Sequence, residues 1–431
     1  MTEEGQQKIR SLVEMAMSYI AEPKPLSVPA VPESLDALVE QLNSKLSLQG
    51  EEKQEQQQQQ QQQQAEQEEE SWDGEAFGVR LAGLAKLLAN DVTKATLACK
   101  PPAETKTVIG MVDALGETCF RLAGFIDSIP VKVAGQTYKR EIQTLANDIF
   151  LATATLLNEF LEVKVEKLVQ IQQQNLAIGG SMNGLNDIAA ESSGLSSEAT
   201  KEDAYLVKTG IVWEACEIFE KASRSNRQAV AKKWGDMMLT LEDAIAEVQE
   251  MIDSNDDKKG NNDDSDDEED DSGSDSDDSW NDDQKMTEEE KQLSIRSNAL
   301  LKLTRLLFKK LQQRCLDTQP SLTVATAAAD ASEPSSSSSM TLKPSDLARM
   351  WDQLYDRAGG IVALADEIAT SLYSPQDQPA IIGLLQELSR KNHDCILVGR
   401  LFVRGQAEHE KWLDMCEAQS KKILDTVQQH Q

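Results

Sequence analysis

Histidines, aromatic residues and long apolar runs are all scarce in this sequence of 431 residues. Its three histidines, His393, His409 and His430, never stand three or four residues apart, so no helical pair of them could hold a metal ion. The glycine cluster GGSMNG lacks the lysine and the Ser/Thr of a phosphate-binding loop. We therefore predict no catalytic residues, no metal site and no cofactor, and hence a protein that is not an enzyme.

Paired cysteine motifs and membrane signals are also missing. No CxxC or Cys/His cluster occurs, which predicts reduced thiols in a core rather than disulfides or a metal site. No uninterrupted apolar run approaches 18 residues, and the start MTEEGQQKIR lacks the apolar core of a signal peptide. We expect an intracellular protein without a membrane partner. The six cysteines are Cys99, Cys119, Cys216, Cys315, Cys395 and Cys416.

Basic residues are outnumbered, and the net charge is -31. Residues 253–283 contribute -14 of this charge and residues 51–75 contribute -8, so the rest of the chain is only mildly acidic. Binding to nucleic acid requires clustered Lys and Arg to neutralise phosphates. The balance of charge therefore predicts no direct nucleic-acid ligand.

What the sequence does contain is helical periodicity. Leu, Ala, Glu, Gln and Lys dominate its periodic segments, and only 4% of the residues are aromatic, which favours helices over sheets. The fold class predicted is all-α, with two antiparallel helical bundles joined by a disordered acidic linker. The spacing of apolar residues predicts helices over 3–20, 34–48, 77–98, 104–129, 138–174, 198–222, 227–252, 287–316, 345–373, 378–388 and 393–427. Thr287 followed by Glu290 fits a capping box.

Composition divides the chain into five parts. The Gln/Glu-rich segment is of low complexity and is compatible with either a solvated helix or disorder. The parts are N-terminal amphipathic helices in 1–50, the low-complexity segment 51–71, a first bundle in 72–254, the acidic linker 255–284, and a second bundle in 285–431 with a Ser-rich loop at 318–343.

Four tryptophans stand at helical positions. Tryptophan is enriched among the residues that anchor protein interfaces, but an apolar helical position is also where a core residue stands. We regard both roles as open for Trp213, Trp234, Trp351 and Trp412.

The acidic tract NDDSDDEEDDSGSDSDDSW contains serines that are followed by an acidic residue three positions later, the pattern that acidophilic kinases favour. Each phosphate would add about -1.5 to -2 charges. The tract therefore predicts a phosphorylated tether or, alternatively, a chaperone-like surface for basic proteins. The candidate phosphorylation sites are Ser265, Ser272, Ser274 and Ser279.

The order of several segments resembles one known family, the cyclin-D-binding or GCIP family. The segments are RLAGLAKLLANDVTKATLACKPPAETKTV (80–108), REIQTLANDIFLATATLLNEFLE (140–162), VWEACEIFEKASRSNRQAVAKKW (212–234), DDSWNDDQ leading into LLKLTRLLFKKL, and LYDRAGGIVALADEIATSLYSPQD (354–377). Together they span about residues 80–388.

The resemblance implies bundles similar to those of vinculin and α-catenin. It also implies binding of D-type cyclins or transcription regulators, negative regulation of cell-cycle progression and of transcription, and residence in both cytoplasm and nucleus. The rival interpretations are a vinculin-type cytoskeletal adaptor and an acidic chaperone for basic proteins.

Overall fold

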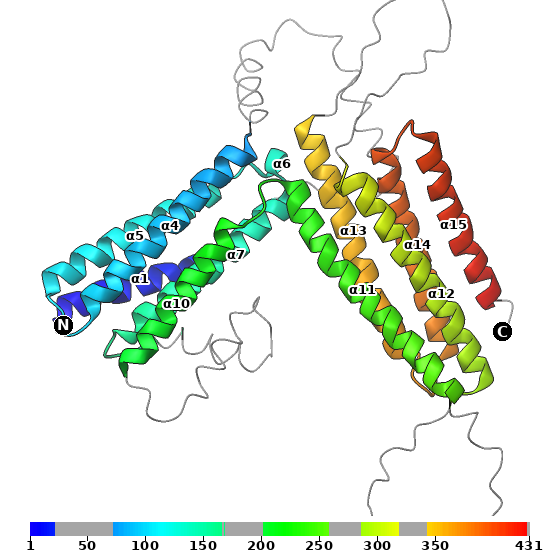
Figure 1. Cartoon of the computed structure of the whole chain (residues 1–431), viewed down its shortest axis with the longest axis horizontal. Coiled ribbons are helices and arrows are strands. Elements are labelled where there is room, and N and C mark those ends of the chain that lie inside the picture. Colours follow the sequence, from blue (N-terminus) through cyan, green and yellow to red (C-terminus); the bar gives the residue numbers. More distant parts are fainter. Residues whose placement is uncertain (22–71, 166–167, 169–200, 258–285, 319–342, 429–431) are drawn as a thin grey trace, which may run out of the picture. The chain divides into compact units, whose positions relative to one another are not determined.

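Helices make up the regular structure of the part of the chain that can be described (Figure 1). The structure, a computed structural model, describes residues 1–21, 72–165, 168, 201–257, 286–318 and 343–428. The chain divides into two compact units, Met1–Ala229 and Val230–Gln431. The predicted all-α fold of two bundles is confirmed.

Among the described residues of the first unit, five long helices form a closed bundle. Around the bundle the order is α1, α5, α4, α10 and α7, and α7 packs on α1 again. Their apolar stripes meet in one core, to which α7 contributes most because it is buried on several sides. The elements are α1 (Glu3–Ala21), α4 (Gly74–Cys99), α5 (Thr105–Asp127), the short α6 (Val131–Ala134), α7 (Gln136–Glu159) and α10 (Lys201–Glu220).

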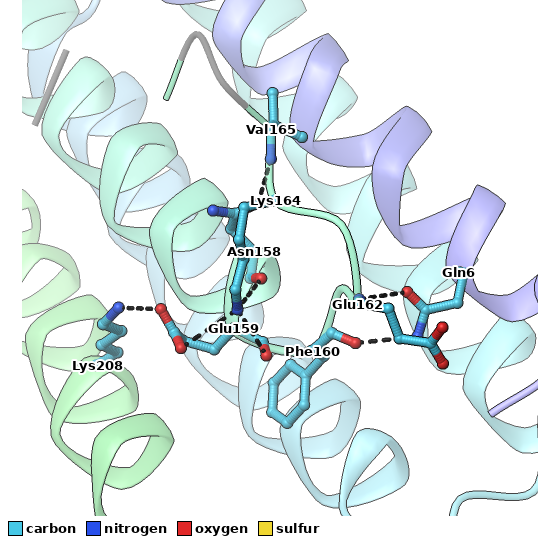
Figure 2. A network of polar contacts seen from close by, with 8 residues as sticks. All are labelled: Gln6, Asn158, Glu159, Phe160, Glu162, Lys164, Val165 and Lys208. Atoms are coloured by element: carbon cyan, nitrogen blue, oxygen red, sulfur yellow. Dashed lines mark hydrogen bonds and ion pairs between the residues drawn. The ribbon is translucent and has the colours of Figure 1, made fainter. Parts of the chain in front are cut away.

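Helix α7 ends earlier than its apolar pattern indicates, so the predicted helix over 138–174 is wrong over residues 160–165, and residues 169–174 lie outside the described part of the chain. The helix stops at Glu159, and a network of side chains replaces the next helical hydrogen bonds (Figure 2). Asn158 Oδ1 accepts the amide of Val165 at 2.9 Å, and Lys164 Nζ donates to the Asn158 carbonyl at 2.8 Å. These contacts satisfy backbone groups that would otherwise be left unpaired at a helix end.

In the described part of the second unit, five α-helices surround a separate core. Helices α11 and α12 run antiparallel, because Arg305 pairs with Glu242 at 2.6 Å while Lys302 donates to Gln249 at 2.8 Å. Helix α12 passes directly into one turn of π-helix. The elements are α11 (Asn226–Asp257), α12 (Glu288–Leu311), the π-helix η2 (Gln312–Leu316), α13 (Pro344–Ser371), α14 (Gln378–Phe402) and α15 (Ala407–Gln428).

The boundary between the units differs from the predicted one. It falls inside α11, between Ala229 and Val230, and not at 254–255. The reason is that the stripe of Trp234, Leu241 and Val248 packs into the core of the second unit. The acidic tract thus connects two helices of the same unit, and the prediction that it links the two bundles is wrong.

A second correction concerns the C-terminal helices. The predicted break near residues 389–392 is absent, and α14 continues from Gln378 to Phe402. Asn392, in the stretch between the two predicted helices, is buried and donates to Thr304 Oγ1 at 2.8 Å, so it is a packed residue of the core. The chain turns instead at Gly405, whose φ of 81° suits glycine.

Several predictions fall outside the described residues. They are the helix over 34–48, the Gln/Glu-rich segment 51–71, most of the acidic linker 255–284 with its candidate phosphorylation sites Ser265, Ser272, Ser274 and Ser279, and most of the Ser-rich loop 318–343.

The predicted capping box at the start of α12 is confirmed. Its glutamate, Glu290, also binds residues of the turn before α14. Glu290 accepts the amide of Thr287 at 2.8 Å and, from the turn before α14, the amide of Gln376 at 2.9 Å. Ser374 Oγ also donates to this carboxylate, at 3.3 Å. Glu290 therefore fastens the turn between α13 and α14 to the start of α12. Burial alone would raise the pKa of Glu290, but the amides of Gln376 and Thr287 outweigh it and hold the pKa below its usual range.

Replacing Glu290→Gln is expected to destabilise the second unit by about 1–3 kcal/mol at pH 7, because a neutral amide accepts these bonds less well than a carboxylate. A depressed carboxyl pKa stabilises above the unfolded pKa, near 4.3, and the benefit disappears as pH falls through the folded value. The difference between wild type and variant should thus shrink in acid. Urea unfolding at pH 7 and pH 3 measures it, and a difference that does not depend on pH would contradict the clamp.

Candidate protein-interaction surfaces

The four tryptophans proposed as anchors or core residues occupy different environments. Trp234 is fully buried, its ring lies 4.7 Å from that of Phe308, and its Nε1–H donates to the Phe308 carbonyl at 3.3 Å. It is a core residue of the second unit. The hypothesis that Trp234 anchors a partner is therefore wrong, because no face of the indole is accessible.

Trp351 and Trp412 are partly buried and hold the second unit together. Trp351 Nε1–H donates to the Cys315 carbonyl, in the π-helical turn, at 3.0 Å. The ring of Trp412 lies beneath Lys310, whose Nζ is 5.4 Å from the ring centroid, a cation–π distance. Both rings have partners within the bundle.

Trp213 is the most exposed of the four, with 45% of its surface accessible on α10. Its Nε1–H donates to Thr93 Oγ1 of α4 at 3.1 Å, so the ring is held in one orientation. A side chain that is fixed before binding loses less conformational entropy when a partner covers it. Trp213 therefore remains a candidate anchor residue.

Trp213 belongs to a wider apolar area on the outer faces of α4 and α10. The two helices are antiparallel, as shown by the contacts of Lys86 with Glu220, of Thr93 with Trp213 and of Thr96 with Thr209. This register places the exposed Leu97 of α4 beside the part of α10 that carries Leu206 and Trp213. We call Leu97, Leu206 and Trp213 the α4–α10 face; Leu97 is 67% and Leu206 58% exposed.

Glycine opens the middle of the α4–α10 face. Gly210 lies between Leu206 and Trp213 on the outer side of α10, and a Cβ added there would meet nothing within 4 Å. The outer side of α10 therefore has open space between Leu206 and Trp213. The sequence prediction missed Leu97 and Leu206; the only sequence signal was that residues 206, 210, 213 and 217 share one helical face.

The second unit has a different hollow, of about 530 Å³, between α12, α14 and α15. Its floor is apolar, with Leu303, Leu307 and Ile396. Some of its polar lining residues pair with one another, such as His393 Nδ1 with Glu417 at 2.9 Å. Because none of its lining residues is an exposed large hydrophobic side chain, we regard the α4–α10 face as the stronger candidate.

The described residues offer no alternative site chemistry. All six cysteines are free and buried, which confirms their predicted place in the core, and burial raises the pKa of the Cys216 thiol to about 12. Among the described residues no group of His, Cys, Asp and Glu is arranged to hold a metal ion. No described helix is both long and apolar enough to cross a membrane.

The described residues thus define a class of protein: paired helical bundles that carry an accessible aromatic and aliphatic face. Two family models match the chain, the N-terminal region of the Grap2 and cyclin-D-interacting proteins over residues 80–254 and their C-terminal region over residues 262–395. The chain belongs to this family of Grap2 and cyclin-D-interacting (GCIP) proteins. A search of curated proteins finds no match.

Proposed function

We propose that the protein is a non-enzymatic regulator that binds partner proteins, D-type cyclins among them, through the α4–α10 face. The family description, Grap2 and cyclin-D-interacting, supports the partner class, and the match covers α10 and nearly all of α4. By restraining such partners the protein would slow cell-cycle progression and transcription, in both cytoplasm and nucleus.

The exposure of Trp213 is the observation that favours the α4–α10 face as the binding surface. Interface energy is concentrated in a few residues, among which tryptophan is enriched, and these residues are surrounded by contacts that exclude water. Leu97 and Leu206 provide such surroundings on both helices. Charges of both signs border the face, because Lys86 of α4 pairs with Glu220 of α10 at 3.3 Å.

Replacing Trp213→Ala is expected to weaken binding of a D-type cyclin from the same cells by about 2 kcal/mol or more, which is roughly 30-fold. Titration calorimetry with purified full-length chain measures the change. Phe120→Ala is the matched control, because Phe120 is an aromatic residue of the same unit that is 72% exposed on α5, away from this face. It should leave the affinity unchanged.

The outcomes separate the rival functions. If wild-type chain binds no cyclin but sediments with actin and stays out of nuclei, the cytoskeletal adaptor is correct and the proposed function fails. If removing residues 262–280 abolishes partner binding while Trp213→Ala does not, the acidic tract is the binding element and the chain is an acidic chaperone. Equal loss in Trp213→Ala and Phe120→Ala would show that neither face is specific.

A further inference from the structure

Helix α1 lies along α5 and α7 in the first unit (Figure 1). Its fully buried residues form a single stripe, the partly buried Met15, Tyr19 and Ile20 pack beside it, and the opposite side of the helix is exposed. Helix α7, by contrast, is buried on several sides. Helix α1 thus fills a groove between two helices. The stripe consists of Gly5, Ile9, Leu12, Val13, Ala16 and Met17.

Contacts along the groove fix the direction of α1. Lys8 Nζ lies 2.6 Å from Asp113 on α5, and Leu12 follows against Gly116, so α1 is parallel to α5. At the other end the ring of Tyr19 meets that of Phe150 on α7, with centroids 4.8 Å apart. A Cβ at position 116 would lie 3.5 Å from Leu12 Cδ1, an ordinary van der Waals distance, so α1 and α5 are in direct contact at this point.

Near the start of α1, the side chain of Gln6 forms hydrogen bonds with main-chain atoms (Figure 2). Gln6 Nε2 donates to the Phe160 carbonyl at 3.0 Å, and Gln6 Oε1 accepts the Glu162 amide at 3.0 Å. Arg10 Nη2 donates to the Val163 carbonyl at 2.8 Å. These backbone groups follow the end of α7, and any helix that presents an amide and, four residues later, a cation could bind them.

The groove and the helix that fills it differ in their relation to the family. Residues 80–254, which the family model matches, include all of α5, α7 and α10 and therefore both walls of the groove. Helix α1 lies outside this range, and residues 22–71 separate it from α4. The matched region thus contains both helices that flank α1, whereas α1 itself lies outside the match.

We propose that the groove between α5 and α7 is a docking site for an amphipathic helix of a partner protein, and that α1 is its intramolecular competitor. The partner helix carries apolar residues with the spacing of Ile9, Leu12, Val13 and Ala16. It has a Gln or Asn three residues before the first of them, and an Arg or Lys directly after it. A tethered competitor acts at an effective concentration on the order of millimolar, so a free helix of equal affinity binds only when α1 is released.

The test uses a labelled peptide with the sequence of residues 1–21 and full-length chain with a protease site inserted between Gly50 and Glu51. Fluorescence anisotropy at micromolar protein should show peptide binding that is about 100-fold tighter after cleavage than before, because the competitor is no longer tethered. Gln6→Ala in the peptide should weaken binding by about 10-fold. Gln7→Ala, the same change at an exposed position, should have no effect.

A second variant gives a result even if the substitution unfolds the chain. Ile9→Asp in the uncut chain should release α1 and admit the peptide; if this chain unfolds, the peptide should restore its helical circular dichroism. Three results would overturn the proposal: no peptide binding after cleavage, no restoration of helical structure in an unfolded variant, or a peptide affinity that Gln6→Ala leaves unchanged. A wild-type chain of twice the monomer mass that becomes monomeric on cleavage would instead make α1 of a second copy the occupant. None of these variants alters Leu97, Leu206 or Trp213, so the proposed cyclin contact is tested independently.

Discussion

Trp234→Ala is expected to destabilise the second unit by about 3–5 kcal/mol, the cost of removing a large aromatic side chain from a core. The indole is fully buried against Phe308, and its N–H satisfies the Phe308 carbonyl. That carbonyl lies in the last turn of α12, where the α-helix passes into the π-helix. The alanine variant would leave both a cavity and a weakened junction between α11 and α12.

Hydrogen exchange measured by mass spectrometry locates this loss. Amides of α11 and α12 should exchange faster in Trp234→Ala while those of α7, in the other unit, stay protected. Trp234→Phe retains a ring but not the indole N–H, and should cost less than the alanine variant. Trp213→Ala, the same chemical change at a half-exposed position, should cost no more than about 1–2 kcal/mol. Equal costs at 213 and 234 would contradict the contrast between the two environments.

That contrast was only partly accessible from the sequence. In α10 the buried residues Tyr205, Val212 and Phe219 recur every seven positions, and Trp213 stands one position beside them. In α11, by contrast, Trp234 is itself a member of the seven-residue repeat of buried residues, together with Leu241 and Val248. Helical spacing alone therefore distinguishes the two tryptophans, although it does not show that Leu97 of α4 lies beside the exposed one.

Local features were predicted well and long-range ones were not. The start of α12 depends on Thr287 and Glu290, three residues apart, and the sequence alone revealed it. The end of α7 depends on Asn158 and on contacts made from α1 by Gln6, more than 150 residues away. The prediction placed α11 in the first bundle for the same reason: periodicity reveals an apolar stripe, but not which helices will cover it.

The fold also contains a carboxylate whose burial costs stability. Asp148 of α7 is 8% exposed, and no hydrogen bond or ion pair joins it to the described residues. Burial raises the pKa of Asp148 from 3.8 to about 6. Between these two values the folded chain binds more protons than the unfolded chain, so stability falls as pH rises through this window. Above pH 6 the full penalty applies, and below pH 3.8 it vanishes.

Asp148→Asn is therefore expected to stabilise the first unit by about 2–3 kcal/mol at pH 7, at 1.36 kcal/mol for each pKa unit. The gain should decline through pH 6 to 4 and be absent near pH 3.5, where the aspartic acid is itself neutral. Hydrogen exchange of α7 amides across this pH range measures it. Glu217→Gln, which removes one negative charge from the exposed side of α10, is the control and should change stability little at any pH. A variant gain that is the same at pH 7 and pH 3.5 would show that packing, and not the burial of charge, limits the stability at this position.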